Sequence, residues 1–182
     1  MPFNPAQVYS PAEDTYLLLK AARHEVKPSD RAIEIGSGNG LIAAALAEIA
    51  ESVVATDISP HAVAHAHALG IDVIRTDLCA GLSGSFTLIV FNPPYLPTQL
   101  DERIGDWLEY ALDGGVSGRV VIERFAADAG RVLAPAGRIL LLISALTGLA
   151  EVSRLFLSNG YSVTVVQEQR VEDETLYVLR IA

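Results

Sequence analysis

Short apolar runs alternate with helical patterns along most of this chain. The predicted strands are rich in Ile, Val and Leu, and they lie at residues 31–35, 53–56, 71–75, 86–91 and 138–144. The predicted helices have apolar positions three and four residues apart, and they lie at residues 41–50, 60–69, 116–133 and 148–158. Strands buried on both faces that alternate with helices predict an α/β domain with a parallel sheet.

The end of the chain departs from this alternation. Residues 161–169 and 175–181 are two strand patterns that are separated only by an acidic turn at residues 171–174. Two strands without a helix between them pair antiparallel, as a β-hairpin. A sheet that ends in such a hairpin differs from the dinucleotide-binding domain of dehydrogenases, in which helices separate the strands throughout.

A further helix follows the N-terminal arm. Ser10 is its predicted N-cap, Pro11 suits the first helical position, and Glu13 completes a capping box. Residues 1–25 are therefore predicted to form an arm and a capping helix. The sequence contains no linker, repeat or low-complexity tract, so we expect residues 1–182 to fold as a single domain.

The composition limits what this domain binds. Hydrophobic residues make up 51% of the 182 positions, which predicts a well-filled core. The net charge of −9 repels phosphate backbones, so we do not expect direct binding to nucleic acid. The single cysteine, Cys79, forms no internal disulfide, and no apolar run reaches the length of a membrane span. We therefore expect a cytoplasmic protein with no membrane contact and no metal of its own.

A glycine-rich turn follows the first predicted strand. Gly36, Gly38 and Gly40 make room for a ligand against the backbone at the start of a helix. Their spacing matches neither the dinucleotide-binding fingerprint nor a P-loop. Glu34 lies inside the strand just before this turn, where a carboxylate calls for a specific partner. The turn alone is a weak signal, because glycines also serve tight packing.

Acidic residues end the next two predicted strands. Asp57 stands where a carboxylate can accept hydrogen bonds from both hydroxyls of a ribose. Asp77 offers another acid, and Leu78 beside it offers an apolar surface for an adenine ring. The alternative is that Asp57 and Asp77 cap helices or turns. The pattern favours a nucleoside without a pyrophosphate, and S-adenosylmethionine fits best.

The fourth predicted strand leads directly into Asn92, Pro93, Pro94 and Tyr95. Two prolines remove N–H donors, so the segment presents mostly hydrogen-bond acceptors. The Asn92 side-chain oxygen and the Pro93 carbonyl could together hold both hydrogens of a planar NH2 group, and Tyr95 could stack on it. Such alignment beside an activated methyl group supplies much of the rate without a strong base. A Pro-Pro turn that merely closes a strand is the alternative.

Four stretches together resemble the HemK-like class I methyltransferases, namely residues 8–15, 34–40, 56–58 and 92–95. The resemblance extends from about Val8 to the C-terminus, and the hairpin ending agrees with it. Within this family, the chain is similar to the archaeal and eukaryotic branch. That branch methylates the glutamine of the Gly-Gly-Gln motif in class I translation release factors. It implies a doubly wound, Rossmann-like sheet of seven strands in the order 3-2-1-4-5-7-6.

The resemblance also implies residue roles. Contact with S-adenosylmethionine is implied for Thr15, Glu34, Gly36, Gly38, Asp57, Asp77, Leu78 and Asn92. Catalytic roles are implied for Asn92, Pro93 and Tyr95, and substrate contact for these three and Pro94. The activity implied is protein-glutamine N5-methylation. The alternatives are an amino-methyltransferase acting on adenine or guanine in RNA or DNA, and an inactive binding subunit.

Relatives in this branch work with a small zinc-binding activator protein, so the resemblance implies a heterodimer. The strand at residues 71–75 is predicted at the sheet edge, and Ile71, Val73 and Ile74 lack the usual protection of an exposed edge. A partner could add a strand there. An edge that is shielded by its own loops is the alternative.

Other side chains carry weaker signals. His61, His65 and His67 share a predicted helix, and we expect surface histidines rather than metal ligands. Trp107 and Tyr110 could line the substrate entrance or pack under their loop. Glu13 and Asp14 are interpreted mainly as acidic residues that complement the dipole at a helix start.

Overall fold

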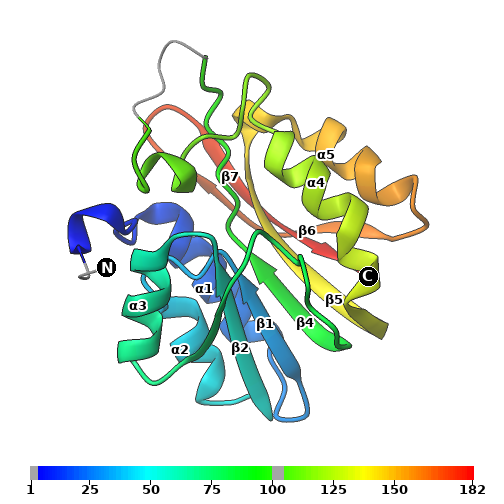
Figure 1. Cartoon of the computed structure of the whole chain (residues 1–182). Helices are drawn as coiled ribbons and strands as arrows, with labels where there is room; N and C mark the ends of the chain where they lie inside the picture. Colours follow the sequence, from blue (N-terminus) through cyan, green and yellow to red (C-terminus); the bar gives the residue numbers. More distant parts are fainter. Residues whose placement is uncertain (1–3, 100–104) are drawn as a thin grey trace.

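The computed structural model describes residues 4–99 and 105–182 and contains one seven-stranded sheet (Figure 1). Its strand order is β3-β2-β1-β4-β5-β7-β6. The strands are β1 (Arg31–Ile35), β2 (Ser52–Asp57), β3 (Asp72–Arg75), β4 (Phe86–Phe91), β5 (Leu133–Ser144), β6 (Val163–Arg170) and β7 (Thr175–Ile181). The first five pair in parallel, whereas β7 runs antiparallel to both β5 and β6. The predicted fold class, strand order and C-terminal hairpin are confirmed.

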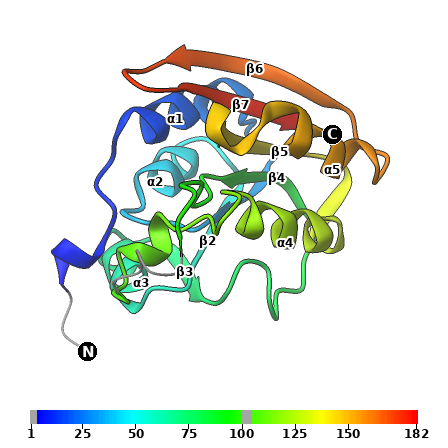
Figure 2. The same ribbon diagram turned by 90° about the horizontal axis from the view of Figure 1, so that it is seen from above.

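Helices cover both faces of this sheet. They are α1 (Glu13–Glu25), α2 (Leu41–Ala47), α3 (Pro60–Ala68), α4 (Val120–Asp128) and α5 (Leu149–Leu157). The first three cover one face, and α4 and α5 cover the other (Figures 1 and 2). None of these helices in the described part of the chain has the length and apolarity of a membrane span.

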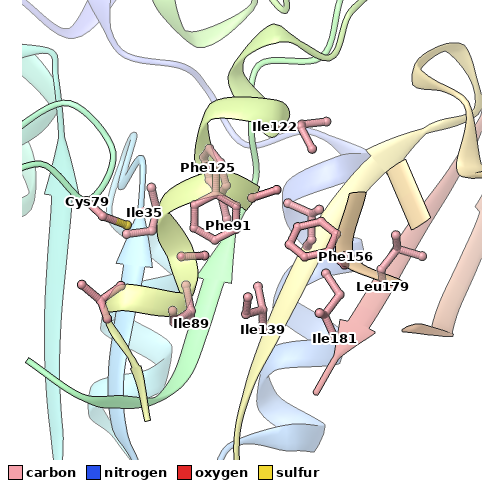
Figure 3. Close-up of a cluster of buried hydrophobic side chains, with 14 of the residues drawn as sticks. Ile35, Cys79, Ile89, Phe91, Ile122, Phe125, Ile139, Phe156, Leu179 and Ile181 are labelled. Carbon is pink, nitrogen blue, oxygen red and sulfur yellow. The ribbon is translucent and has the colours of Figure 1, made fainter. Parts of the chain in front are cut away.

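Side chains of the central strands alternate between two apolar layers. Ile33 and Ile35 of β1 belong to the layer under α4 and α5, whereas Ala32 belongs to the layer under α1 and α2. In the first layer the ring of Phe91 lies 4.9 Å from that of Phe125 in an edge-to-face pair (Figure 3). Because both faces are covered, the ends of the strands are where polar groups can meet a ligand.

Two predicted helix starts are wrong. The first helix begins at Glu13 with Ala12 at its N-cap and no side-chain cap, so Ser10 forms no capping box. The helix expected over residues 116–133 begins only at Val120, because Gly118 has a φ of +67°, which a right-handed helix does not allow. Its predicted end also overlaps β5, which begins at Leu133.

His61 does not lie at the surface, so the prediction for this histidine is wrong. Its side chain is buried, and its Nδ1 accepts a hydrogen bond of 3.3 Å from the backbone N–H of Asn4. This bond ties the N-terminal arm to α3. Cys79 is also buried, as expected for a small apolar residue, and burial raises the pKa of its thiol to about 11.

A buried ion pair lies at the amino ends of the strands. The guanidinium of Arg138 donates to both carboxylate oxygens of Asp30, at 3.0 Å and 2.8 Å, and to Oε2 of Glu25 at 3.2 Å. These bonds connect β5 to the start of β1 and to the last turn of α1. They therefore fix α1 against the sheet, and the first turn of the same helix reaches the opposite end of the strands.

Candidate active site

A cavity of about 310 Å³ lies at the carboxyl ends of the central strands. All the residues selected from the sequence line it: Thr15, Glu34, Gly36, Gly38, Asp57, Asp77, Leu78, Asn92, Pro93, Pro94 and Tyr95. Five separate stretches of the chain therefore meet at one place, where open α/β sheets hold their ligands. The roles assigned to these residues stay predictions.

The glycine-rich turn forms one wall of the cavity. Gly38 has a φ of +51°, and a Cβ atom there would have no heavy atom within 4 Å. The backbone is therefore open to the cavity at this point. The N–H of Gly38 donates to Oδ2 of Asp57 at 2.9 Å, and this bond holds the turn against the end of β2.

Glu34 lies beneath the turn and is buried. Its Oε2 accepts a hydrogen bond of 2.8 Å from the N–H of Ala43 in the first turn of α2. Burial raises the pKa of Glu34 well above its ordinary value, although the bond from Ala43 acts in the opposite direction. The specific partner that a carboxylate in a strand needs is thus the start of a helix.

Asp57 stabilises a turn, which is the alternative role considered from its position; its role in binding a ribose stays a prediction. Its Oδ1 accepts from the N–H of Ser59, the N-cap residue of α3, at 2.8 Å, so it does stabilise a turn. Besides these backbone bonds, the carboxylate keeps acceptor capacity for a ligand. Burial raises the pKa of Asp57.

Asp77 has a partner that the sequence did not reveal. Its Oδ2 accepts from the guanidinium of Arg124, on α4, at 2.6 Å. Both side chains are about half exposed, and both line the cavity. Leu78 next to them has a φ of +51°, a strained conformation that turns the chain at this wall.

Asn92 is held by Asp14 at the far wall. Its Nδ2 donates to Oδ2 of Asp14 at 3.0 Å, whereas its Oδ1 is buried and has no hydrogen-bond partner. Tyr95, two residues after Pro93, has its pKa raised by burial and by the nearby charges of Asp14 and Glu174, so its hydroxyl stays protonated.

Buried polar atoms without a partner share one location. Within residues 4–99 and 105–182 they are Ser37 Oγ, Thr56 Oγ1 and Asn92 Oδ1, and all three residues line the cavity. Buried polar atoms normally have partners, so such a group marks a place for a polar ligand. The cavity thus fits a ligand with several hydrogen-bonding groups.

Asp14 lies in the first turn of α1, as its interpretation as a helix-start residue holds, and it also lines the cavity. It is buried, and its carboxylate accepts from the Tyr9 hydroxyl at 3.2 Å and from the Thr15 N–H at 2.6 Å. Burial, followed by the charge of Asp14, raises the pKa of Tyr9. No local pattern indicates the contact of Asp14 with Asn92, because it joins residues 78 positions apart.

Trp107 and Tyr110 line the cavity near its mouth, with their ring centroids 5.2 Å apart. The N–H of Trp107 donates to Oε1 of Gln7 at 2.9 Å, and the Arg75 guanidinium lies 5.6 Å from the Trp107 ring centre. The N-terminal arm and this segment thus form one wall together. Among the described residues, no group of three or more His, Cys, Asp or Glu is placed to hold a metal.

Known proteins are similar to this chain in sequence and in architecture. The profile of the family "Methyltransferase small domain" matches residues 6–105. Putative protein N5-glutamine methyltransferase MJ0928 of Methanocaldococcus jannaschii is 39% identical, over 95% of this chain and 90% of that protein. Human methyltransferase HEMK2 is 34% identical, over 96% of this chain and 89% of that protein. A chain of the solved E. cuniculi Mtq2–Trm112 complex matches with a TM-score of 0.80 and 29% sequence identity, over 96% of this chain and 98% of that one. That complex is described as responsible for the methylation of the eRF1 translation termination factor.

Gly118, in the turn before α4, allows a testable prediction about the site. A Cβ atom at Gly118 would lie 2.6 Å from the backbone oxygen of Tyr95. We expect Gly118→Ala to lower the free energy of unfolding by about 2 kcal/mol or more, because the left-handed conformation and the clash both cost energy. Chemical denaturation measures this loss, and the amide resonances of Asn92 and Tyr95 should shift.

Gly160 provides the matched control. It has a φ of +85°, but no heavy atom lies within 4 Å of its Cβ position. Gly160→Ala should therefore cost only the roughly 1–2 kcal/mol of the left-handed conformation and leave the resonances of Asn92 and Tyr95 unchanged. Equal effects of the two variants would contradict the close approach of Gly118 to Tyr95.

Proposed function

This chain belongs to the methyltransferase small domain family, and we propose that it methylates the side-chain amide nitrogen of the glutamine in the Gly-Gly-Gln motif of a class I translation release factor, with S-adenosylmethionine as donor. The unpartnered, buried Oδ1 of Asn92 in the cavity carries this proposal. The names of the relatives support it, because MJ0928 is named as a protein N5-glutamine methyltransferase. Such an activity belongs to the cytoplasm, where translation ends.

The donor fits the part of the cavity near β1, β2 and β3. Asp57 would accept the ribose hydroxyls through its remaining lone pairs, and Asp77 and Leu78 would border the adenine. The backbone of Gly36 and Gly38 leaves room for the rest of the donor. When bound, the donor supplies a methyl group that its sulfonium charge has already activated.

The substrate amide fits the part of the cavity at Asn92. The Asn92 Oδ1 and the Pro93 carbonyl would accept the two amide hydrogens, so the nitrogen lone pair points along one direction, toward the methyl group. Tyr95 would stack against the amide plane. Orientation accounts for the rate here, and a strong base is not needed.

Charge favours an amide on a protein over a base in a nucleic acid. Besides burial, Asp14, Glu174 and Glu13 lie close enough to Tyr95 to raise the pKa of its hydroxyl. These negative charges near Tyr95 repel the phosphates that flank a target base. We therefore place methylation of adenine or guanine second, as an outcome for the experiment below to exclude.

The cofactor assignment predicts the effect of Asp57→Ala. Each hydrogen bond from a ribose hydroxyl to the carboxylate is worth roughly 1.5–3 kcal/mol, so the Kd for S-adenosylmethionine should rise at least about tenfold. Calorimetry on the folded variant measures this change. Glu51→Ala, which removes an exposed charge just before β2, is the control and should bind normally. Unchanged affinity in Asp57→Ala would refute the ribose assignment.

The catalytic assignment predicts the effect of Asn92→Ala. Methyl transfer from labelled S-adenosylmethionine to a class I release factor should fall roughly a hundredfold in kcat, because the amide is no longer aligned. Mass spectrometry should place the methyl group of the wild-type reaction on the glutamine amide. The exposed Asn159 provides a control variant, Asn159→Ala, with normal turnover. Methylation of RNA or DNA in place of the release factor would support the alternative function.

We also propose that the chain works as a heterodimer with a small zinc-binding protein, which adds a strand to β3. The solved complex of Mtq2 with Trm112 supports a partner of this kind. β3 lies at the sheet edge, and Ile74 on it is 46% exposed. Ile71 is not part of this surface, because it is buried among Ala43, Ala55 and Ala66.

Ile74→Glu tests this interface. The charge should prevent docking, so the co-expressed pair should no longer co-migrate in size-exclusion chromatography, while the chain keeps its thermal stability. Leu157→Glu is the control, because Leu157 on α5 is similarly exposed but lies away from β3. A chain that is soluble, monomeric and fully active on release factor by itself would contradict the need for a partner.

A further inference from the structure

We propose that Asp14 is a positioning residue: it fixes which end of the Asn92 amide faces the cavity and thereby selects substrates that present an NH2 group. This inference rests on the proposed function, because it assumes that Asn92 holds the substrate amide. Asp14 acts through Asn92 and does not need to touch the substrate itself.

The contacts of Asp14 leave the Asn92 amide only one orientation. The carboxylate of Asp14 is an acceptor only, and its Oδ2 lies 3.0 Å from Asn92 Nδ2. Rotating the Asn92 amide by half a turn would bring its oxygen against a carboxylate oxygen, and a hydrogen bond would become a repulsion. Asn92 Oδ1 therefore points away from Asp14, buried and without a partner.

Asp14 itself is held by three donors besides Asn92. Its Oδ1 accepts from the backbone N–H of Thr15 at 2.6 Å and from the Thr15 hydroxyl at 3.2 Å. Its Oδ2 accepts from the Tyr9 hydroxyl at 3.2 Å in addition to Asn92. The backbone N–H of Thr15 determines the orientation of the side chain at position 14, because this N–H cannot rotate away. It therefore always requires an acceptor on its side of residue 14.

This fixed donor determines what Asp14→Asn would do. The new amide must keep its oxygen toward the Thr15 N–H, so its NH2 group faces Asn92. Asn92 then turns its oxygen toward residue 14 and its NH2 group toward the cavity. The cavity would present donors where an amide substrate needs acceptors, and selectivity for NH2 groups would be lost.

The experiment measures methyl transfer to the release factor and S-adenosylmethionine affinity in Asp14→Asn. We expect kcat to fall roughly ten- to hundredfold, which is the range for a lost charge-assisted hydrogen bond, with the Kd for S-adenosylmethionine within about twofold of wild type. Glu51→Gln removes an exposed charge that does not line the cavity and should leave both values unchanged. A normal kcat in folded Asp14→Asn would overturn the proposal.

A paired exchange separates positioning from a structural role. In the double variant Asp14→Asn/Asn92→Asp, the new amide at position 14 donates to one oxygen of the new carboxylate at position 92, and the other oxygen faces the cavity as an acceptor. The double variant should be at least about fivefold more active than Asn92→Asp alone, in which two carboxylates face each other. This comparison holds even if Asp14→Asn alone does not fold. A double variant no more active than Asn92→Asp would overturn the proposal.

An NMR measurement tests the orientation without any substrate. The side-chain 15N–1H pair of Asn92, assigned by its absence in Asn92→Ala, should shift and exchange faster in Asp14→Asn, because the NH2 group leaves Asp14. An unchanged pair would refute the role of Asp14, whatever the substrate is. Wild-type protein that leaves the release factor unmethylated but shows the NMR change would refute the proposed substrate alone.

Discussion

The site depends on the reversal of strand order between β1 and β4. After β1 the chain crosses to α2 on one face of the sheet, and after β4 it continues to α4 on the other. The connections that follow β1 and β4 leave toward opposite faces of the sheet, so the carboxyl ends of these adjacent strands stay uncovered. The glycine turn and the Asn92 segment face each other there because parallel pairing places Ile35 opposite Phe91.

Three of the acidic groups that line the cavity accept hydrogen bonds from backbone N–H groups. Glu34 accepts from Ala43, Asp57 from Gly38 and Ser59, and Asp14 from Thr15. Backbone donors fix a carboxylate in direction as well as in energy, since they cannot rotate away. Asp77 differs, because it pairs with the guanidinium of Arg124, which also lines the cavity.

The sequence predicted the parts of the molecule that local pattern determines. The last strand, Thr175–Ile181, has the predicted bounds, and the residues selected around Gly36, Asp57 and Asn92 line one cavity. Several of the features that the sequence missed depend on contacts between distant residues. Asp14 turns toward Asn92, His61 accepts from Asn4, and Arg124 crosses to Asp77, and none of these pairs leaves a local signal. The capping box at Ser10 is also wrong, because α1 begins at Glu13 with Ala12 at its N-cap.

The wall shared by the N-terminal arm and the segment at Trp107 joins two distant parts of the chain. Gln7 and Trp107 are bonded to each other although they are 100 residues apart in sequence. A chain that lacks Trp107 can still form the β1 turn and α2, and its arm can still bond to α3 through Asn4 and His61, but Gln7 has no partner at this wall. Contacts of such long range slow folding, because closing the loop between the two residues costs entropy. The cavity is therefore complete only when the N-terminal arm and the segment at Trp107 are both in place. Loss of either segment opens the same wall.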